Sequence, residues 1–404
     1  MMNIQPITAG GQLSLDNQTV FASQGKFMVT EGVFEQFELR ADDYQPGSGR
    51  LTTFLRNKLA NAKLAGVENP IVVGAFPFDQ GQKACLRIPL KWQQLSLEQM
   101  TAVLQRGTNA QPSVKALTHV PVGDGYKASV NAAKAQFARG EMDKVVLAKC
   151  LDIEAFGEIS KSAVLAQLVR KNTSGYHFSV PLDNKRILLG VSPELLLRKV
   201  GNGIESNPLA GSRRRTKNQV ADKALQIELL GSDKDKIEHS YVTEAIKQQL
   251  TPHCSSLMVP NSPTLLSTKT MWHLSSHIDG QLKDDKFDAA ELACMLHPTP
   301  AVGGTPDKQA KDAIKALESF EREFFAGTLG WMNSEGDGEW VVSIRCAMVS
   351  KAHARLYAGA GIVVASCPQE ELDEVNAKLK TMEEVFGFSY INSANLNPGE
   401  AYVS

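Results

Sequence analysis

Residues 141–150 read EMDKVVLAKC, a short run with a lysine near each end of an apolar stretch. Alternate side chains of a strand point to opposite faces of a sheet, so Lys144 shares a face with Val146, whereas Lys149 lies on the other face. Burial of a lysine is costly unless the ammonium is paired or loses its proton. We therefore expect one of the two lysines to face the interior for a specific reason.

The composition is that of an ordinary globular protein. The chain has 404 residues, enough for one large domain or for two or three smaller ones, with 43 basic and 44 acidic residues. This balance argues against a nucleic-acid or membrane-surface partner and favours small-molecule chemistry. The six cysteines include no C-x-x-C pair, and the chain shows no targeting segment or long apolar run. We expect a cytoplasmic protein with reduced thiols.

The N-terminal third shows strand and helix patterns. Apolar runs predict strands within 26–34, 70–78 and 84–90, and apolar residues at helical spacing predict a helix over 51–65. The turn-rich segment 106–125 is a candidate domain boundary or a long loop.

The rest of the chain mixes helices and strands without a regular β-α-β alternation. Helices are expected at 126–139, 233–250, 288–296, 305–325 and 367–386, and strands at 175–180, 185–192, 195–206 (a hairpin), 339–349 and 354–364. This order predicts an α+β fold with a mostly antiparallel sheet core flanked by helices. No phosphate-binding glycine motif occurs in a suitable context.

The last predicted helix carries an acidic face. Ser366 and Gln369 form a potential capping box, and Glu371, Glu374 and Lys378 follow on one side of the helix. This face is either solvated, with an ordinary Glu–Lys pair, or part of a site.

Two further glutamates occupy apolar surroundings. Glu238 shares a helix face with Val242, so its carboxylate needs a cation, either a basic side chain or a hard ion such as Mg2+. Glu194 follows a Ser-Pro step in an apolar run, where desolvation would raise the carboxyl pKa and suit a general acid. Alternatively, Glu194 pairs with Arg198.

Ten ordered sequence blocks within residues 126–388 resemble those of the chorismate-utilising enzymes, and most closely those of isochorismate synthases. The family also includes salicylate synthase and the first components of anthranilate and aminodeoxychorismate synthase. The blocks are KVVLAK, SPELLLRK, PLAGSRRR, DKIEHSYV, MWHLSSHI, HPTPAVGGTP, FEREFFAGTLGW, SIRCAMV, YAGAGIV and the E-x-x-E-x-x-x-K of the last helix.

The resemblance implies one large domain, in which residues 1–115 extend the sheet core and residues 116–392 carry the catalytic motifs. It implies chorismate as substrate and Mg2+ as cofactor. By this matching, Lys144 is the inward lysine and the base, and Glu194 is the general acid. Glu238 and Glu374 are the metal ligands, with Glu371 adjacent.

The resemblance also implies a set of substrate contacts. Arg345 and Tyr357 are expected to hold the pyruvyl carboxylate, and His273 to lie near the ring carboxylate. Gly359 and Gly361 are expected to let backbone N–H groups approach the substrate. The remaining implied substrate contacts are Gly211, Ala301, Phe325 and Lys378.

Several features separate the chain from other family members. Ala210 stands where members of the aminodeoxychorismate type often carry a lysine, so no covalent amine intermediate is expected. Amine-forming members take ammonia from a glutaminase partner, and no such subunit is expected here. Ala301 and Phe325 lack the hydroxyl groups that salicylate-forming relatives place there. A salicylate synthase or a non-catalytic chorismate-binding relative are the alternatives.

Some features stay open from the sequence. Cys367 replaces the usual aspartate before the last helix. The basic run 213–215 falls in a family loop without an assigned role. The expected protein is a monomer, and catechol siderophore synthesis is the expected pathway.

Overall fold

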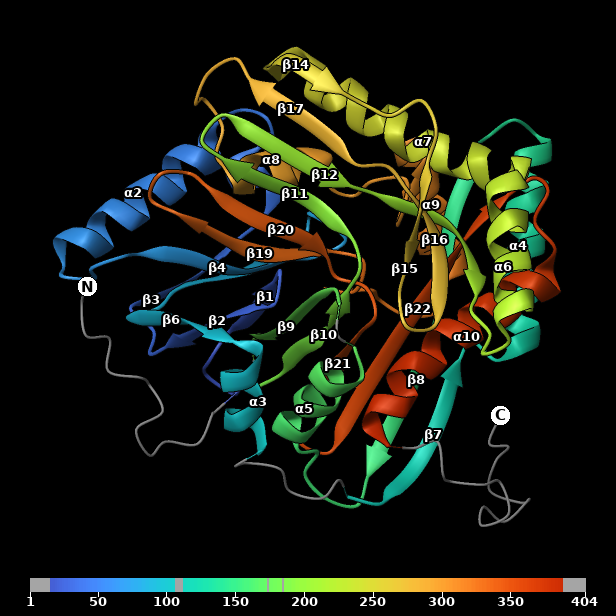
Figure 1. The fold of residues 1–404 in the computed structure, drawn as a ribbon, viewed down its shortest axis with the longest axis horizontal. Coiled ribbons are helices and arrows are strands. Elements are labelled where there is room, and N and C mark those ends of the chain that lie inside the picture. Colours follow the sequence, from blue (N-terminus) through green and yellow to red (C-terminus); the bar gives the residue numbers. More distant parts are fainter. Residues whose placement is uncertain (1–14, 106–111, 173, 184, 388–404) are drawn as a thin grey trace.

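The computed structural model describes residues 15–105, 112–172, 174–183 and 185–387, and every strand pair in this part is antiparallel. Three sheets result (Figure 1). The first runs in the order β18 (Gly304–Thr305), β8 (Lys144–Ala155), β22 (His353–Val363), β21 (Cys346–Val349), β10 (Ile187–Ser192), β9 (Tyr176–Pro181), β1 (Val20–Ser23), β2 (Lys26–Glu31) and β6 (Lys91–Ser96), with β7 (Val114–Val120) also paired to β8.

The second large sheet packs beside the first, and a small third sheet lies next to them. The second sheet runs β14 (Cys254–Met258), β17 (Ile278–Leu282), β12 (Gly203–Asn207), β11 (Leu195–Val200), β20 (Gly338–Val342), β19 (Thr328–Asn333), β4 (Ile71–Phe76), β5 (Ala84–Ile88) and β3 (Glu35–Leu39). The third runs β13 (Leu209–Arg214), β16 (Met271–Ser275) and β15 (Thr264–Ser267). One continuous apolar cluster joins the two large sheets.

Helices cover the outer faces of the sheets (Figure 1). Against the first sheet lie α4 (Gly123–Ala138), α5 (Lys161–Lys171) and α10 (Pro368–Phe386). The second sheet is covered by α8 (Ala289–Leu296), with α2 (Arg50–Leu64) behind it, and β13 is covered by α6 (Gln219–Gly231) and α7 (Asp233–Leu250). The remaining helices are α1 (Ala41–Tyr44), α3 (Leu97–Gln105), α9 (Asp307–Leu317) and the short η1 (Thr251–His253).

The predicted α+β class with an antiparallel sheet core is confirmed. The N-terminal third contributes β1, β2 and β6 to the first sheet and β3, β4 and β5 to the second. Part of the turn-rich segment 106–125 is strand β7, which pairs with β8, and residues 106–111 lie outside the described residues. No helix in the described ranges is long and apolar enough to cross a membrane.

Three predicted element boundaries are wrong. The helix expected to reach residue 325 ends at Leu317, because Glu318 leaves the helical conformation and its carboxylate binds Arg322 and the N–H of Ala148. The strand expected over 339–349 is two strands, β20 and β21, which belong to different sheets. Cys367, rather than Ser366, is the N-cap of α10.

Both lysines of the opening segment are buried, so the expectation of a single inward lysine is wrong. Lys144 is 0% exposed and Lys149 is 4% exposed. Lys149 Nζ donates a hydrogen bond to Asn376 of α10. The reason is that helices cover one face of β8 while α7 approaches the other, so neither face meets solvent.

The edge of β8 opposite β22 is completed by side chains. β18 pairs with β8 at Lys144 and Val145, and β7 pairs with it only from Cys150 onward. Between these strands, Arg322 Nη2 donates to the carbonyl of Val146 at 2.7 Å, and the N–H of Ala148 donates to Glu318 Oε1 at 2.7 Å. The ion pair of Arg322 and Glu318 thus takes the place of a neighbouring strand.

Candidate active site

A polar cavity opens where β8 and β22 of the first sheet approach β13, α7 and α10. The segment between β20 and β21 and the loop before β18 complete its wall. The lining residues are Val146, Pro193, Glu194, Leu209, Ala210, Gly211, Ser212, Glu238, His273, Ala301, Val302, Phe325, Ala326, Ile344, Arg345, Ala358, Gly359, Gly361, Glu374 and Lys378.

Glu194 is a buried acid on one wall of this cavity. It connects β10 to β11 and is 3% exposed. Burial raises the pKa of Glu194 to about 8, although an N–H of Leu209 and the charges of Lys144 and Lys378 act in the opposite direction. The carboxyl group therefore keeps its proton at neutral pH and can donate it.

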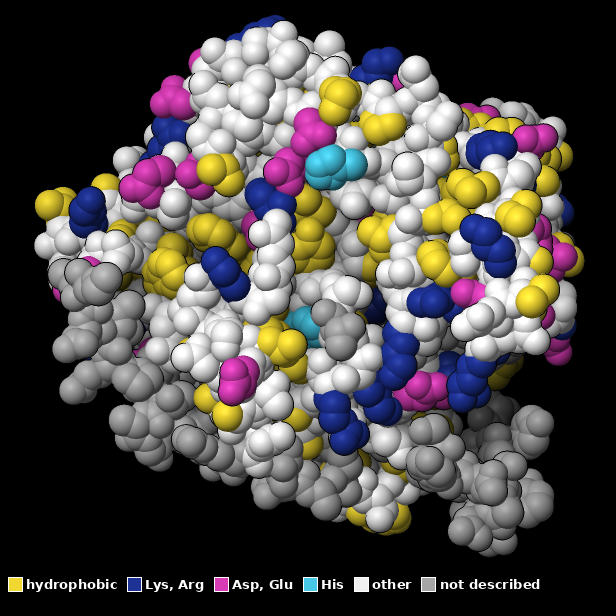
Figure 2. Space-filling view, in the orientation of Figure 1, with side chains coloured by type: hydrophobic (Ala, Val, Ile, Leu, Met, Phe, Trp, Pro, Cys, Tyr) yellow, Lys and Arg dark blue, Asp and Glu magenta, His cyan; other side chains and the backbone are white. Residues whose placement is uncertain are grey.

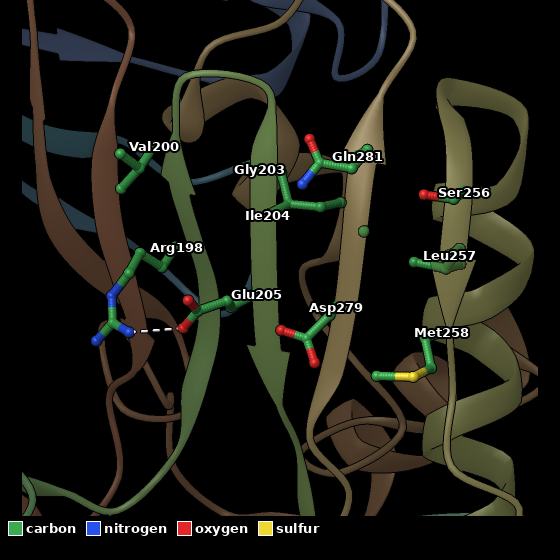
Figure 3. A pocket seen from close by; sticks show the side chains of 11 residues that line it. Arg198, Val200, Gly203, Ile204, Glu205, Ser256, Leu257, Met258, Asp279 and Gln281 are labelled. Carbon is green, nitrogen blue, oxygen red and sulfur yellow. Dashed lines mark hydrogen bonds and ion pairs between the residues drawn. The ribbon is translucent and has the colours of Figure 1, made fainter.

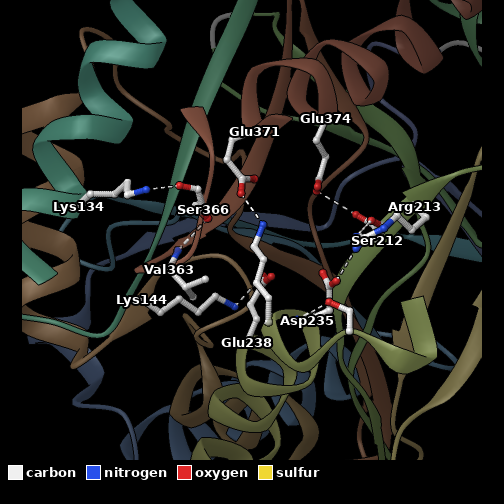
Figure 4. Close-up of polar contacts among 12 residues, drawn as sticks. Lys134, Lys144, Ser212, Arg213, Asp235, Glu238, Val363, Ser366, Glu371 and Glu374 are labelled. Carbon is white, nitrogen blue, oxygen red and sulfur yellow. Dashed lines mark hydrogen bonds and ion pairs between the residues drawn. The ribbon is translucent and has the colours of Figure 1, made fainter. Parts of the chain in front are cut away.

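Three glutamates approach one another from α7 and α10. In Figure 4 the side chains of Glu371 and Glu374 extend from α10 toward α7, and the carboxylate of Glu374 points to Ser212. Each carboxylate has a lysine partner. The pairs are Glu238–Lys144 at 3.2 Å, Glu371–Lys234 at 2.6 Å and Glu374–Lys378 at 2.6 Å.

The two glutamates of α10 have opposite pKa shifts. Burial and then the charge of Glu374 raise the pKa of Glu371, against the opposing effect of Lys234. Burial also acts to raise the pKa of Glu374, but Lys378 and the hydroxyl of Ser212, which donates at 2.9 Å, outweigh it, and the pKa is lowered. Glu374 is therefore the more firmly ionised of the two.

The donor types at this cluster suit a hard divalent cation. Carboxylate oxygens are the ligands that Mg2+ prefers, and the mutual repulsion of Glu371 and Glu374 shows that the cluster needs positive charge. As arranged, no three carboxylate, histidine or cysteine groups of the described residues are close enough to form a metal site. Lysine ammonium groups supply the positive charge instead.

Arg345 and His273 provide the other polar groups of the cavity. Arg345 is 7% exposed and has a φ of 51°, in the left-handed region, at the point where the chain crosses between the sheets. Burial lowers the pKa of Arg345 to about 10, so the group stays cationic at neutral pH. Burial, followed by the charges of Arg345 and Lys378, lowers the pKa of His273 well below its usual range, so the imidazole is neutral.

Two predicted glycines are required by close approach. A Cβ atom at Gly361 would lie 2.0 Å from Glu238 Oε1, and one at Gly211 would lie 2.9 Å from Asp235 Cβ. Gly211 also has a φ of 78°, which disfavours other residues. Gly359 lines the cavity, and its carbonyl accepts a hydrogen bond from Lys378.

The structure leaves three predicted residues, Lys144, Tyr357 and Glu371, outside the lining. Tyr357 stacks behind Phe325, with ring centroids 4.8 Å apart, and does not contribute to the cavity wall. Lys144 is fully buried and lies behind Glu238. Ala301 and Phe325 do line the cavity, as expected.

A second, basic cavity adjoins the first. The two share Pro193 and Arg345, and the second is also lined by Lys171, Arg215 and Lys269, with no acidic residue among its described lining. Figure 2 shows lysine and arginine side chains gathered over α5 and α10 on this face. The arrangement favours the approach of an anionic ligand.

The charged partners around the cluster were not found from the sequence. Arg213 belongs to strand β13, not to a loop, and bridges Asp235 of α7 at 2.9 Å and Glu228 of α6 at 2.8 Å. Lys234 reaches Glu371 from the first turn of α7. In the sequence, Lys234 stands four residues before Glu238, which places the two side chains on one side of the helix. This spacing was the only indication that Lys234 lies near the glutamates.

The alternative pairing of Glu194 with Arg198 is absent. Figure 3 shows Arg198 in a groove lined by residues of β11, β12, β14 and β17, where it binds Glu205 at 2.6 Å. Arg198 also contacts Glu339. Its charge is thus neutralised away from the polar cavity.

The chain belongs to the chorismate binding enzyme family, whose profile matches residues 87–387. It is 42% identical over 372 residues to the isochorismate synthase EntC of Escherichia coli (strain K12), covering 92% of this chain and 95% of that protein. A vibriobactin-specific isochorismate synthase of Vibrio cholerae is 38% identical over 362 residues, which cover 90% of this chain and 89% of the relative. The crystal structure of DhbC from Bacillus anthracis superposes with a TM-score of 0.84 at 39% identity, covering 93% of this chain and 97% of that one.

Proposed function

We propose that the protein is an isochorismate synthase, which adds water at C2 of chorismate and releases the C4 hydroxyl as water. The observation that carries the proposal is Glu194, a buried carboxyl group with a pKa of about 8, facing a cavity with a glutamate cluster on its other side. Relatives that carry this name are similar over nearly their whole length.

In this mechanism Glu194 is the general acid. The departing C4 hydroxyl needs a proton as its bond to carbon breaks, and a carboxyl group that is protonated at neutral pH can supply it. General acid catalysis of this kind is typically worth about a hundredfold to ten-thousandfold in rate.

Lys144 is the proposed base for the attacking water. Glu238 Oε1 lies 3.2 Å from Lys144 Nζ. A lysine serves as a base only after it has lost its proton. Movement of the Glu238 carboxylate away from Nζ would uncover the amine for the attacking water.

Glu238 and Glu374 are the proposed ligands of Mg2+, with Glu371 close by. When bound, the ion would neutralise the ring carboxylate of chorismate. Arg345 offers a planar pair of donors for the second carboxylate of the substrate, and neutral His273 offers a hydrogen-bonding group nearby. Tyr357 receives no role, because it stacks behind Phe325, whose ring lines the cavity in its place.

The product is proposed to be isochorismate and not salicylate. Ala301 and Phe325 lie on the cavity wall and have no hydroxyl group to hold the substrate in the pose for pyruvate elimination. Ala210 lines the same wall, so a covalent amine intermediate and a glutaminase partner are not expected.

The test is to incubate the purified protein with chorismate and Mg2+ and to separate the products by liquid chromatography. A reversible mixture of chorismate and isochorismate without pyruvate supports the proposal. Salicylate with an equal amount of pyruvate would assign a salicylate synthase, and absence of any conversion would indicate a non-catalytic relative.

The proposed pathway is catechol siderophore synthesis, supported by the similarity to the vibriobactin-specific enzyme. Deletion of the gene should then impair growth only when iron is scarce, and added 2,3-dihydroxybenzoate should restore it. A growth defect that menaquinone corrects instead would contradict this pathway.

A further inference from the structure

Lys234 lies where the carboxylates of α7 and α10 approach one another. Its Nζ is 2.6 Å from Glu371 Oε1, and Glu371 is 2% exposed. Burial acts to lower the pKa of Lys234, but the charges of Glu371, Glu238 and Asp235 outweigh it and raise the pKa. The contact of Lys234 with Glu371 thus joins the first turn of α7 to the first turn of α10, beside the proposed metal ligands.

Lys234 is also the lysine best able to leave the cluster. Lys144 is 0% exposed, whereas Lys378 is held by the carbonyl of Gly359 at 3.0 Å as well as by Glu374. The side chain of Lys234 is 26% exposed, and Glu371 is its one hydrogen-bond acceptor within the described residues. It can turn into solvent by breaking a single contact.

We propose that Lys234 competes with Mg2+ for the carboxylate cluster and so sets the affinity of the protein for the metal. An ammonium group and a divalent cation within a few ångströms repel each other strongly where water is scarce. Metal binding is therefore an exchange, in which the ion replaces Lys234 beside Glu371. This inference rests on the proposed function, because that function names Mg2+ as the ion.

Titration calorimetry of the metal-free, full-length protein with MgCl2 tests the exchange. The Lys234→Met variant should bind Mg2+ about tenfold more tightly than the wild type, because the competing charge is gone. Lys236→Met is the matched control, since Lys236 lies on the same helix but is exposed. Its affinity should equal that of the wild type.

Thermal unfolding provides a second measurement. Without metal, Lys234→Met should melt below the wild type because the buried carboxylate of Glu371 loses its partner. Added Mg2+ should raise the melting temperature of the variant more than that of the wild type. If Lys234→Met does not fold, Lys234→Gln, which keeps a donor for Glu371 but no charge, takes its place in both measurements.

The outcomes separate this inference from the proposed function. Equal or weaker Mg2+ binding by the variant, with clear binding by the wild type, overturns the exchange and leaves the proposed function intact. Absence of Mg2+ binding by the wild type overturns the magnesium part of the proposed function and this inference with it.

Discussion

Replacement of Glu194 by glutamine should stabilise the protein while it removes catalysis. Burial raises the pKa of this carboxyl group from 4.5 to about 8, so the folded state resists its ionisation. At pH 7 a glutamate is ionised in the unfolded chain but mostly protonated in the folded one. Folding must therefore take up a proton, which costs about 3 kcal/mol at pH 7 for these two pKa values.

The free-energy cost of burying Glu194 should increase with pH. Below about pH 4 Glu194 is protonated in both states, so the cost vanishes. It grows as the pH rises between the two pKa values and levels off near about 5 kcal/mol above about pH 9. Glutamine has a similar shape and no charge, and its side-chain oxygen can still accept a hydrogen bond from the N–H of Leu209. Folding of the variant should therefore not carry this free-energy cost at any pH.

Thermal unfolding at several pH values is the assay. For a chain of this length, about 3 kcal/mol corresponds to a rise in melting temperature of about 4 °C at pH 7. The difference between Glu194→Gln and the wild type should shrink toward pH 5 and widen toward pH 9. Glu335→Gln, at an exposed glutamate, should show no such trend. A difference between Glu194→Gln and the wild type that does not change with pH would refute the argument from burial.

Four further outcomes are expected. The kcat/KM for chorismate should fall as the pH rises past about 8, the pKa of Glu194, because the general acid must keep its proton. A kcat/KM that stays constant up to pH 10 would contradict this role. Chelation with EDTA should stop turnover, and added Mg2+ should restore it. Full activity in excess chelator would mean that the glutamates form ion pairs with lysines and do not bind a metal ion. Arg345→Lys should raise KM for chorismate about tenfold through loss of the planar fork, and an unchanged KM would exclude that contact. Lys269→Glu should lower kcat/KM at low salt and match the wild type at high salt, because Lys269 lines the basic cavity that attracts the anionic substrate. Lys283→Glu, at an exposed lysine outside that cavity, is the control. A loss that does not depend on salt would argue against electrostatic attraction of the substrate.

The resemblance to the chorismate-utilising enzymes anticipated much of the site. Glu194, Glu238 and Glu374 come from distant parts of the chain, yet the resemblance implied that they meet, and the structure brings them to one cavity together with Arg345. The helix over Asp233–Leu250 was predicted at its observed bounds, and Ser232 is its N-cap in the structure. The catalytic and binding roles of the glutamates and of Arg345 remain predictions.

Other features depend on long-range contacts that no local pattern contains. The burial of Lys149 follows from α10 packing over β8, and the left-handed backbone of Arg345 follows from a crossing between two sheets. Tyr357 lies on the right strand but behind Phe325, a distinction made only by three-dimensional packing. The partner of Glu371 likewise comes from another helix.

The ion pair at the open edge of β8 has a consequence for local motion. Backbone amides in a sheet usually exchange with solvent hydrogen only when strands separate, but the amide of Ala148 is held by the Glu318 carboxylate. Its exchange can therefore proceed by rotation of one side chain, while the strand remains paired to β22 on its other edge. The part of β8 next to Lys144 can thus open locally while the rest of the sheet keeps its hydrogen bonds. The hydrogen-exchange rate of the Ala148 amide would measure this opening.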